Sequence, residues 1–240
     1  MARALLTHGA WGQAKAWGEL PARLCALGHD AAAIDLPGHG ADPTPPETVG
    51  LEDYAARIVA ELERGPPAAL IGHSMGGMAI SAAAEAAPER VTRLIYVAAF
   101  LPRDGDSLVS LKSREPATIQ VAVRAGPAKG TTVLDPSLAD EILCHDASAA
   151  QREAALTLLG PQPSKAQVDP LALTAERFGR VPRHYILCRA DRTVTPELQR
   201  AMATETSCAT LDELPTGHLP QLTAPEALAS LIHRTLTGET

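Results

Sequence analysis

A serine set between glycines is the first place where this sequence could do chemistry. The letters GHSMG at residues 72–76 follow an apolar run at residues 68–71, and a stretch of small residues suited to a helix comes next. A Gly-x-Ser-x-Gly sequence between a strand and a helix forms a turn so tight that the serine adopts strained backbone angles, which leave its hydroxyl exposed. We therefore predict that Ser74 is a nucleophile.

A serine nucleophile needs a base to take its proton and an acid to orient that base. In one recurring arrangement the three residues follow the chain order Ser, Asp or Glu, His. Asp191 comes just past an apolar run at residues 184–189, and His218 comes just past another at residues 208–214. The sequence therefore predicts Asp191 as the acid and His218 as the base.

Other candidates for these two roles are less well placed. Asp212 and Glu213 lie inside a strand pattern rather than beyond its end. His73 lies within the serine turn, where its side chain is expected to point away from the nucleophile. The remaining histidines fall in turn or surface patterns, so the prediction of Asp191 and His218 stands.

A carbonyl attacked by serine develops negative charge on its oxygen, and N–H groups must face that oxygen. The N–H of Met75, at the start of the predicted helix, supplies one donor, and the helix dipole has the favourable sign there. The letters THGAW at residues 7–11 follow the first apolar run, and this turn predicts Ala10 N–H as the second donor. Trp11 then stands at the mouth of the pocket, although a purely packing role for its ring is an equal alternative.

Six apolar runs read as the strands that would position these residues. They are Arg3–Thr7, Asp30–Asp35, Ala68–Gly72, Val91–Ala98, His184–Arg189 and Cys208–Leu214. Amphipathic helix patterns lie between most of them, which indicates an α/β fold with a mainly parallel sheet flanked by helices. Residues 103–181 carry no strand pattern, only helix-like pieces broken by Pro and Gly. We predict a helical cap over residues 103–181, inserted after the fourth strand into a core formed by residues 1–102 and 182–240.

Several stretches of the chain together resemble one family. They are HGAW at residues 8–11, DLPGHG at 35–40, GHSMGGM at 72–78, YVAAFLPRDGDSL at 96–108 and TGH at 216–218. The chain resembles the α/β-hydrolase family, in particular the small plant methyl-ester esterases and hydroxynitrile lyases and their bacterial relatives. This resemblance implies the α/β-hydrolase fold, a cap that closes over the active site, and an acyl pocket lined by Phe100.

Two positions separate this chain from the lyases of that branch. In those lyases a Thr follows the His of the first-strand loop and a Lys follows the catalytic His, whereas this chain has Gly9 and Leu219 there. The resemblance therefore implies a serine esterase acting on a small-molecule ester, with Gly9, Trp11, Phe100 and Leu219 lining the substrate site. A hydrolase-fold ligand sensor with little turnover, and a hydrolase or cyclase that tailors a natural product, are the alternatives.

Composition narrows the remaining possibilities. A net charge of −7 argues against nucleic acid or anionic membranes as partners. No apolar run is long enough to predict a signal peptide or a membrane span, so we expect a cytoplasmic protein, either a monomer or a homodimer. The four cysteines are far apart, which predicts neither a zinc site nor disulfides. We expect no metal and no organic cofactor.

Overall fold

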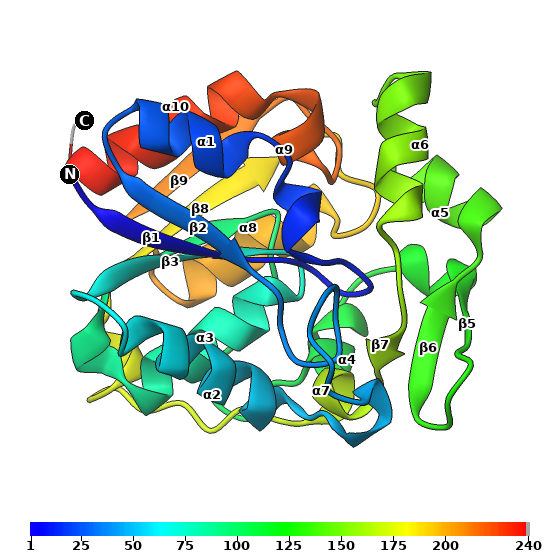
Figure 1. Ribbon diagram of the computed structural model, residues 1–240, viewed down its shortest axis with the longest axis horizontal. Helices are drawn as coiled ribbons and strands as arrows, with labels where there is room; N and C mark the ends of the chain where they lie inside the picture. The colour runs from blue at the N-terminus through cyan, green and yellow to red at the C-terminus, as the bar shows by residue number, and fades with distance from the viewer. Residues whose placement is uncertain (239–240) are drawn as a thin grey trace.

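The computed structural model describes residues 1–238, and a single parallel sheet runs through its centre (Figure 1). All six predicted strands are present, with ends that differ by one or two residues. The sheet consists of β1 (Arg3–Thr7), β2 (Asp30–Ile34), β3 (Ala68–His73), β4 (Val91–Val97), β8 (Arg183–Cys188) and β9 (Thr210–Leu214). Their order across the sheet is β2-β1-β3-β4-β8-β9, and every neighbouring pair is parallel.

Helices cover both faces of this sheet, so each face buries its own hydrophobic cluster. One face carries α2 (Leu51–Leu62), α3 (Gly76–Ala86) and α8 (Pro196–Glu205), and the other carries α1 (Leu20–Ala26) and α10 (Pro225–Thr237). Successive strand residues point to opposite faces, so Leu70 joins the first cluster and Ile71 the second. Burial on both sides explains why β3 reads as a continuous apolar run.

Short helices complete the core and join its strands. They are η1 (Ala14–Trp17), η2 (Pro46–Thr48), η3 (Pro88–Arg90) and α9 (Pro220–Thr223). Among the larger helices, α8 shows how sequence sets a boundary: the hydroxyl of Thr195 accepts from Leu198 N, and Pro196 takes a position where its missing N–H costs nothing. Within residues 1–238 no helix is both long and apolar enough to span a bilayer.

Residues 103–181 are called the cap segment below. In Figure 1 its part from β5 (Val123–Ala125) to α6 (Ala149–Thr157) lies at one side of the central sheet, and the chain then returns along the face that carries α2 and α3. The helix-like pieces predicted in this segment include α5 (Pro136–Leu143) and α6 (Ala149–Thr157). The other helices of the segment are α4 (Leu108–Lys112), η4 (Ile119–Ala122), α7 (Lys165–Val168) and η5 (Phe178–Arg180).

The prediction that the cap segment contains no strand is wrong. It includes a small antiparallel sheet of β5 (Val123–Ala125), β6 (Thr131–Leu134) and β7 (Gln162–Pro163). These strands are too short to show a period-two pattern, and the pairing of β6 with β7 joins residues about thirty positions apart. Local sequence patterns do not report such pairing.

Candidate active site

Ser74 lies on the strained turn that the sequence predicts, between β3 and α3. Its φ angle is +54°, which is uncommon for a residue with a side chain and costs conformational energy. Backbone hydrogen bonds hold this conformation: Ser74 N donates to Val97 O at 3.3 Å, and Ser74 O accepts from Phe100 N at 3.0 Å and from Gly77 N at 3.1 Å. The end of β4 and the residues just after it thus hold the turn through backbone hydrogen bonds.

The glycines on either side of Ser74 are required by close packing. A Cβ on Gly72 would lie 2.7 Å from backbone atoms of Gly76, and one on Gly76 would lie 2.7 Å from the carbonyl oxygens of Thr7 and His8. Real Cβ atoms do not approach that closely. The turn therefore brings the start of α3 directly against the end of β1.

Asp191 and His218 form a buried pair at the carboxyl ends of β8 and β9. Asp191 Oδ2 lies 2.8 Å from His218 Nδ1, and both residues are at most 5% exposed. Asp191 Oδ1 also accepts from the backbone N–H groups of Thr193, at 2.7 Å, and Val194, at 3.0 Å. Gln199 Nε2 donates to Oδ2 at 2.9 Å. Since the Asp191 carboxylate accepts, the Nδ1 proton of His218 faces it and Nε2 is left as the acceptor of the ring.

Asp212, the weaker candidate for the acid, is engaged elsewhere. It lies within β9 and pairs with Arg234 on the protein surface at 3.2 Å. Asp191 therefore has the contact with His218 that the sequence predicts, and Asp212 does not.

Ser74 and His218 line the same cavity, which brings the predicted nucleophile and the predicted base together. Within residues 1–238, Ser74 Oγ and the His218 side chain are not hydrogen-bonded to each other. In hydrolases without substrate this bond is often long, and it shortens when the substrate binds.

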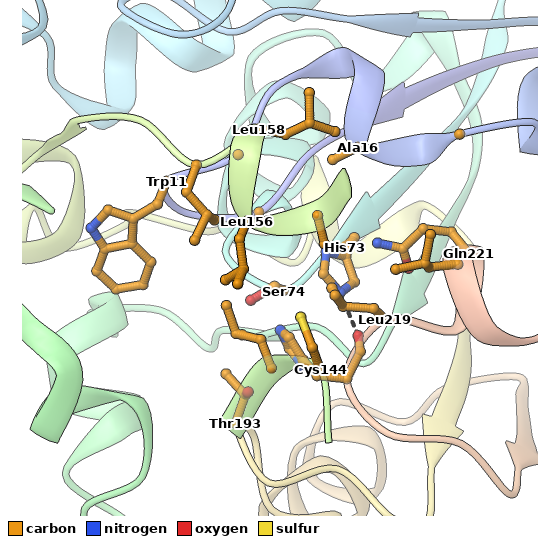
Figure 2. A pocket seen from close by; sticks show the side chains of 18 of the residues that line it. Trp11, Ala16, His73, Ser74, Cys144, Leu156, Leu158, Thr193, Leu219 and Gln221 are labelled. Carbon is orange, nitrogen blue, oxygen red and sulfur yellow. Dashed lines mark hydrogen bonds between the residues drawn. The ribbon is translucent and has the colours of Figure 1, made fainter. Parts of the chain in front are cut away.

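His73, labelled in Figure 2, lines the cavity and contacts the backbone of His218. His73 Nε2 donates to the carbonyl oxygen of His218 at 2.8 Å. Burial lowers the pKa of His73 well below its ordinary value, and the neighbouring His218 lowers it further. A neutral His73 is thus a fixed donor that holds the backbone of His218.

The loop after β1 approaches the nucleophile closely. A Cβ on Gly9 would lie 2.8 Å from Ser74 Cβ, so a side chain there would displace the serine. The N–H groups of Ala10 and Met75 donate no hydrogen bond within residues 1–238. Both predicted oxyanion donors are therefore free to bind a substrate oxygen.

Two buried histidines hold this loop. His8 Nε2 accepts from Leu36 N at 3.2 Å, and His39 Nδ1 donates to Gly12 O at 3.1 Å. His39 Nε2 lies 2.6 Å from the hydroxyl of Tyr54, which donates to it. Both histidines must be neutral to accept at Nε2, and burial lowers the pKa of His8 and lowers that of His39 to about 3.

The cap segment holds the same loop from above. Gln162 of β7 is fully buried, and its Oε1 accepts from Trp11 N at 3.1 Å. The ring of Trp11 donates to the Thr132 hydroxyl at 3.2 Å and packs in a third hydrophobic cluster made mainly of cap residues. Trp11 lines the cavity, and its indole also packs against the cap segment. The residue thus combines a place in the pocket with a packing role, the two alternatives that the sequence left open.

Cap residues also contact the loops that carry the acid and the base. Asp146 Oδ2 accepts from Gly217 N, next to His218, at 2.6 Å. His145 Nε2 donates to Ala190 O, next to Asp191, at 2.9 Å. The ammonium of Lys112 donates to Thr193 O at 2.5 Å and pairs with Glu115. Three separate contacts thus join the cap segment to the ends of β8 and β9.

The cavity above Ser74 has a volume of about 190 Å³. Its walls are mainly aliphatic side chains from α5, α6, α9 and the segments next to them: Leu143, Ala155, Leu156, Leu158, Leu159, Leu219 and Leu222. Its exposed lining residues, Lys15, Gly18 and Ala154, place the mouth between η1 and α6. The few polar side chains inside include Thr193 and Gln221, which the sequence did not single out (Figure 2).

Gly9, Trp11 and Leu219 line this cavity as predicted, whereas Phe100 does not. Phe100 is 3% exposed and packs in the hydrophobic cluster on the α3 face of the sheet. The reason is local: the chain turns after β4, where Ala98 has a φ of +45°, and this turn directs the ring of Phe100 into the core. The contribution of Phe100 to the site is the backbone bond to Ser74 O.

A serine on a strained strand-to-helix turn, with a His–Asp pair beyond two later strands of a parallel sheet, defines the α/β-hydrolase class of fold and site. The sequence model described as "Alpha/beta hydrolase family" matches residues 4–231, and the chain belongs to this family. Within residues 1–238 no group of three or more His, Cys, Asp or Glu side chains could hold a metal ion.

Among its relatives, the chain is 28% identical to salicylic acid-binding protein 2 of Nicotiana tabacum, over 95% of each chain. It is also 28% identical to methylesterase 10 of Arabidopsis thaliana, over 94% of this chain and 86% of the other. The crystal structure of a pyrethroid hydrolase from Sphingobium faniae superposes with a TM-score of 0.88 at 25% identity, covering 99% of this chain and 98% of that one.

Proposed function

We propose that this protein is a serine hydrolase that cleaves a small carboxylic ester through an acyl-enzyme. The observation that carries this proposal is that Ser74, Ala10 with its free N–H, and His218, which is bonded to Asp191 behind it, line one aliphatic cavity. The Met75 N–H, adjacent to Ser74 at the start of α3, is the second free donor.

In the proposed reaction His218 Nε2 takes the proton of Ser74 Oγ as the oxygen attacks the ester carbonyl. Asp191 keeps the other ring nitrogen of His218 protonated and stabilises the imidazolium that forms. The N–H groups of Ala10 and Met75 bind the oxyanion. His218 then gives its proton to the departing alcohol, and a water molecule repeats the sequence on the acyl-enzyme.

The relatives support an ester as the substrate, because one of them is named a methylesterase and another a pyrethroid hydrolase. The cavity supports a small one, because its volume of about 190 Å³ is below the roughly 300–1,000 Å³ of typical ligand pockets. The aliphatic walls favour alkyl groups on the acyl or alcohol part.

Active-site labelling tests the proposal. A fluorophosphonate should modify the wild-type protein once, at Ser74, and Ser74→Ala should lose the label together with at least about 10³-fold of its activity on short-chain aryl esters. The variant should keep its melting temperature, because the Ser74 hydroxyl makes no hydrogen bond within residues 1–238. If the fluorophosphonate does not react with the wild-type protein, and small ligands raise its melting temperature without being hydrolysed, the ligand-sensor alternative is favoured.

A further inference from the structure

Two polar side chains in the cavity are buried without a partner. Thr193 Oγ1 and Gln221 Oε1 make no hydrogen bond within residues 1–238, although each residue is only 4% exposed. Buried polar groups are nearly always paired, because an unpaired one carries its full desolvation cost. Both residues line the cavity with Ser74, so their missing partners belong to whatever occupies it.

Thr193 is held firmly by its backbone. Its N–H donates to Asp191 Oδ1, and its carbonyl oxygen accepts from Lys112 Nζ and from the Thr118 hydroxyl at 2.6 Å. A threonine side chain has few rotamers once its backbone is fixed. The position of the hydroxyl is therefore set in advance by the same loop that carries the catalytic acid.

Gln221 lies on α9, three residues after His218. Its amide nitrogen, like its oxygen, makes no hydrogen bond within the part of the chain that the structure describes. Figure 2 shows Gln221 and Thr193 on different sides of Ser74. The two groups consequently face different parts of any ester whose carbonyl lies at the nucleophile.

The remaining wall between these two residues is largely aliphatic. A plain alkyl ester would fill it but would leave the hydroxyl of Thr193 and the amide of Gln221 unpaired. Sites with buried polar groups discriminate strongly against ligands that cannot pair them. An ester with a hydrogen-bonding oxygen on each side of its carbonyl would satisfy both.

We propose that Thr193 and Gln221 determine specificity, and that the substrate is a small aliphatic ester bearing a hydroxyl on its acyl part and another on its alcohol part, because the unpaired Oε1 of Gln221 can only accept a hydrogen bond. This inference rests on the proposed ester hydrolysis. One of the two residues recognises the acyl substituent, and the other recognises the substituent on the alcohol.

Three matched esters test the inference: propyl butanoate, propyl 3-hydroxybutanoate and 2-hydroxypropyl butanoate. Wild-type kcat/KM should be at least about fivefold higher for each hydroxylated ester than for the plain one. Thr193→Val should bring one of these two ratios close to one, and Gln221→Leu should do the same to the other. Thr193→Ser should keep both ratios, as should Thr204→Val, which removes an exposed hydroxyl on α8.

Thermal melting separates recognition from a structural role. Because Thr193→Val removes an unpaired buried hydroxyl, its melting temperature should equal or exceed that of the wild type. A lower melting temperature together with unchanged ratios would assign Thr193 to structure and overturn the inference. Equal wild-type rates on all three esters, as expected if water molecules satisfy both groups, would overturn the inference alone. No Ser74-dependent cleavage of any ester would overturn the proposed hydrolysis as well.

Discussion

Acidification should destabilise this protein well before its carboxylates begin to titrate. His39 and His73 are buried and neutral, and burial lowers the pKa of His39 to about 3 and that of His73 well below its ordinary value. In the unfolded chain both have a pKa of about 6.5. Below that pH the unfolded state binds protons that the folded state does not, so acid favours unfolding.

The magnitude follows from this difference. Between about pH 7.5 and about pH 5.5 an unfolded histidine goes from mostly neutral to mostly protonated, which lowers the free energy of unfolding by about 1.4 kcal/mol per residue that stays neutral in the fold. His39 and His73 together should therefore cost about 3 kcal/mol over this interval, out of a total that is typically about 5–15 kcal/mol. The pKa of His8 is also lowered, so His8 acts in the same direction.

Urea unfolding at these two pH values, followed by tryptophan fluorescence, measures the effect. His39→Gln is the matched variant. It should be less stable at the higher pH, because the contacts with Gly12 and Tyr54 are altered. On acidification it should lose about 1.4 kcal/mol less than the wild type, which is the share of one histidine. Equal unfolding free energies at the two pH values would refute the reasoning. If His39→Gln loses as much unfolding free energy as the wild type between the two pH values, groups other than His39 take up the protons.

Three further expectations concern catalysis. Asp191→Asn should lower kcat by about 10³-fold or more, because His218 loses the partner that orients it. Asp212→Asn alters only a surface ion pair and should change kcat less than about twofold. The reverse result would show that the acid has been assigned to the wrong strand. Asp146→Ala should lower kcat about tenfold with a smaller change in KM, because the backbone beside His218 loses its cap contact, and an unchanged kcat would contradict this. The protein should release no cyanide above background from mandelonitrile, because Leu219 supplies no cation beside His218, and Ser74-dependent cyanide release would show otherwise.

The centre of the sheet could be predicted from sequence because β3 and most of β4 are buried on both faces, whereas the edge strands β2 and β9 are partly exposed. β3 and β4 carry long apolar runs, and their neighbours are separated by helix patterns of ordinary length. The small sheet of the cap segment could not be predicted, since β7 contains only two residues and its partner is distant in the chain. The limits of the cap segment at residues 103 and 181 stay a prediction.

The juxtaposition of the proposed reacting groups was predictable for a different reason. Ser74, Asp191 and His218 each follow an apolar run, so their places in the chain alone put them at one edge of a parallel sheet. The role of Thr193 could not be predicted in this way. Whether its hydroxyl has a hydrogen-bond partner depends on residues distant in the chain, and no local sequence pattern shows them. Phe100 was assigned through resemblance, and the turn after β4 directs its ring elsewhere.

The anchoring of Trp11 in the cap has a consequence for heat inactivation. Its indole belongs to the hydrophobic cluster of the cap segment, while its neighbour Ala10 carries a proposed oxyanion donor. Segments that share a cluster tend to open as one cooperative unit, with a free energy lower than that of global unfolding. Opening of α5 and the β5-β6-β7 sheet would release the oxyanion loop while the central sheet remained folded. On heating, the protein would lose activity together with the cap, at a lower temperature than the one at which its sheet melts.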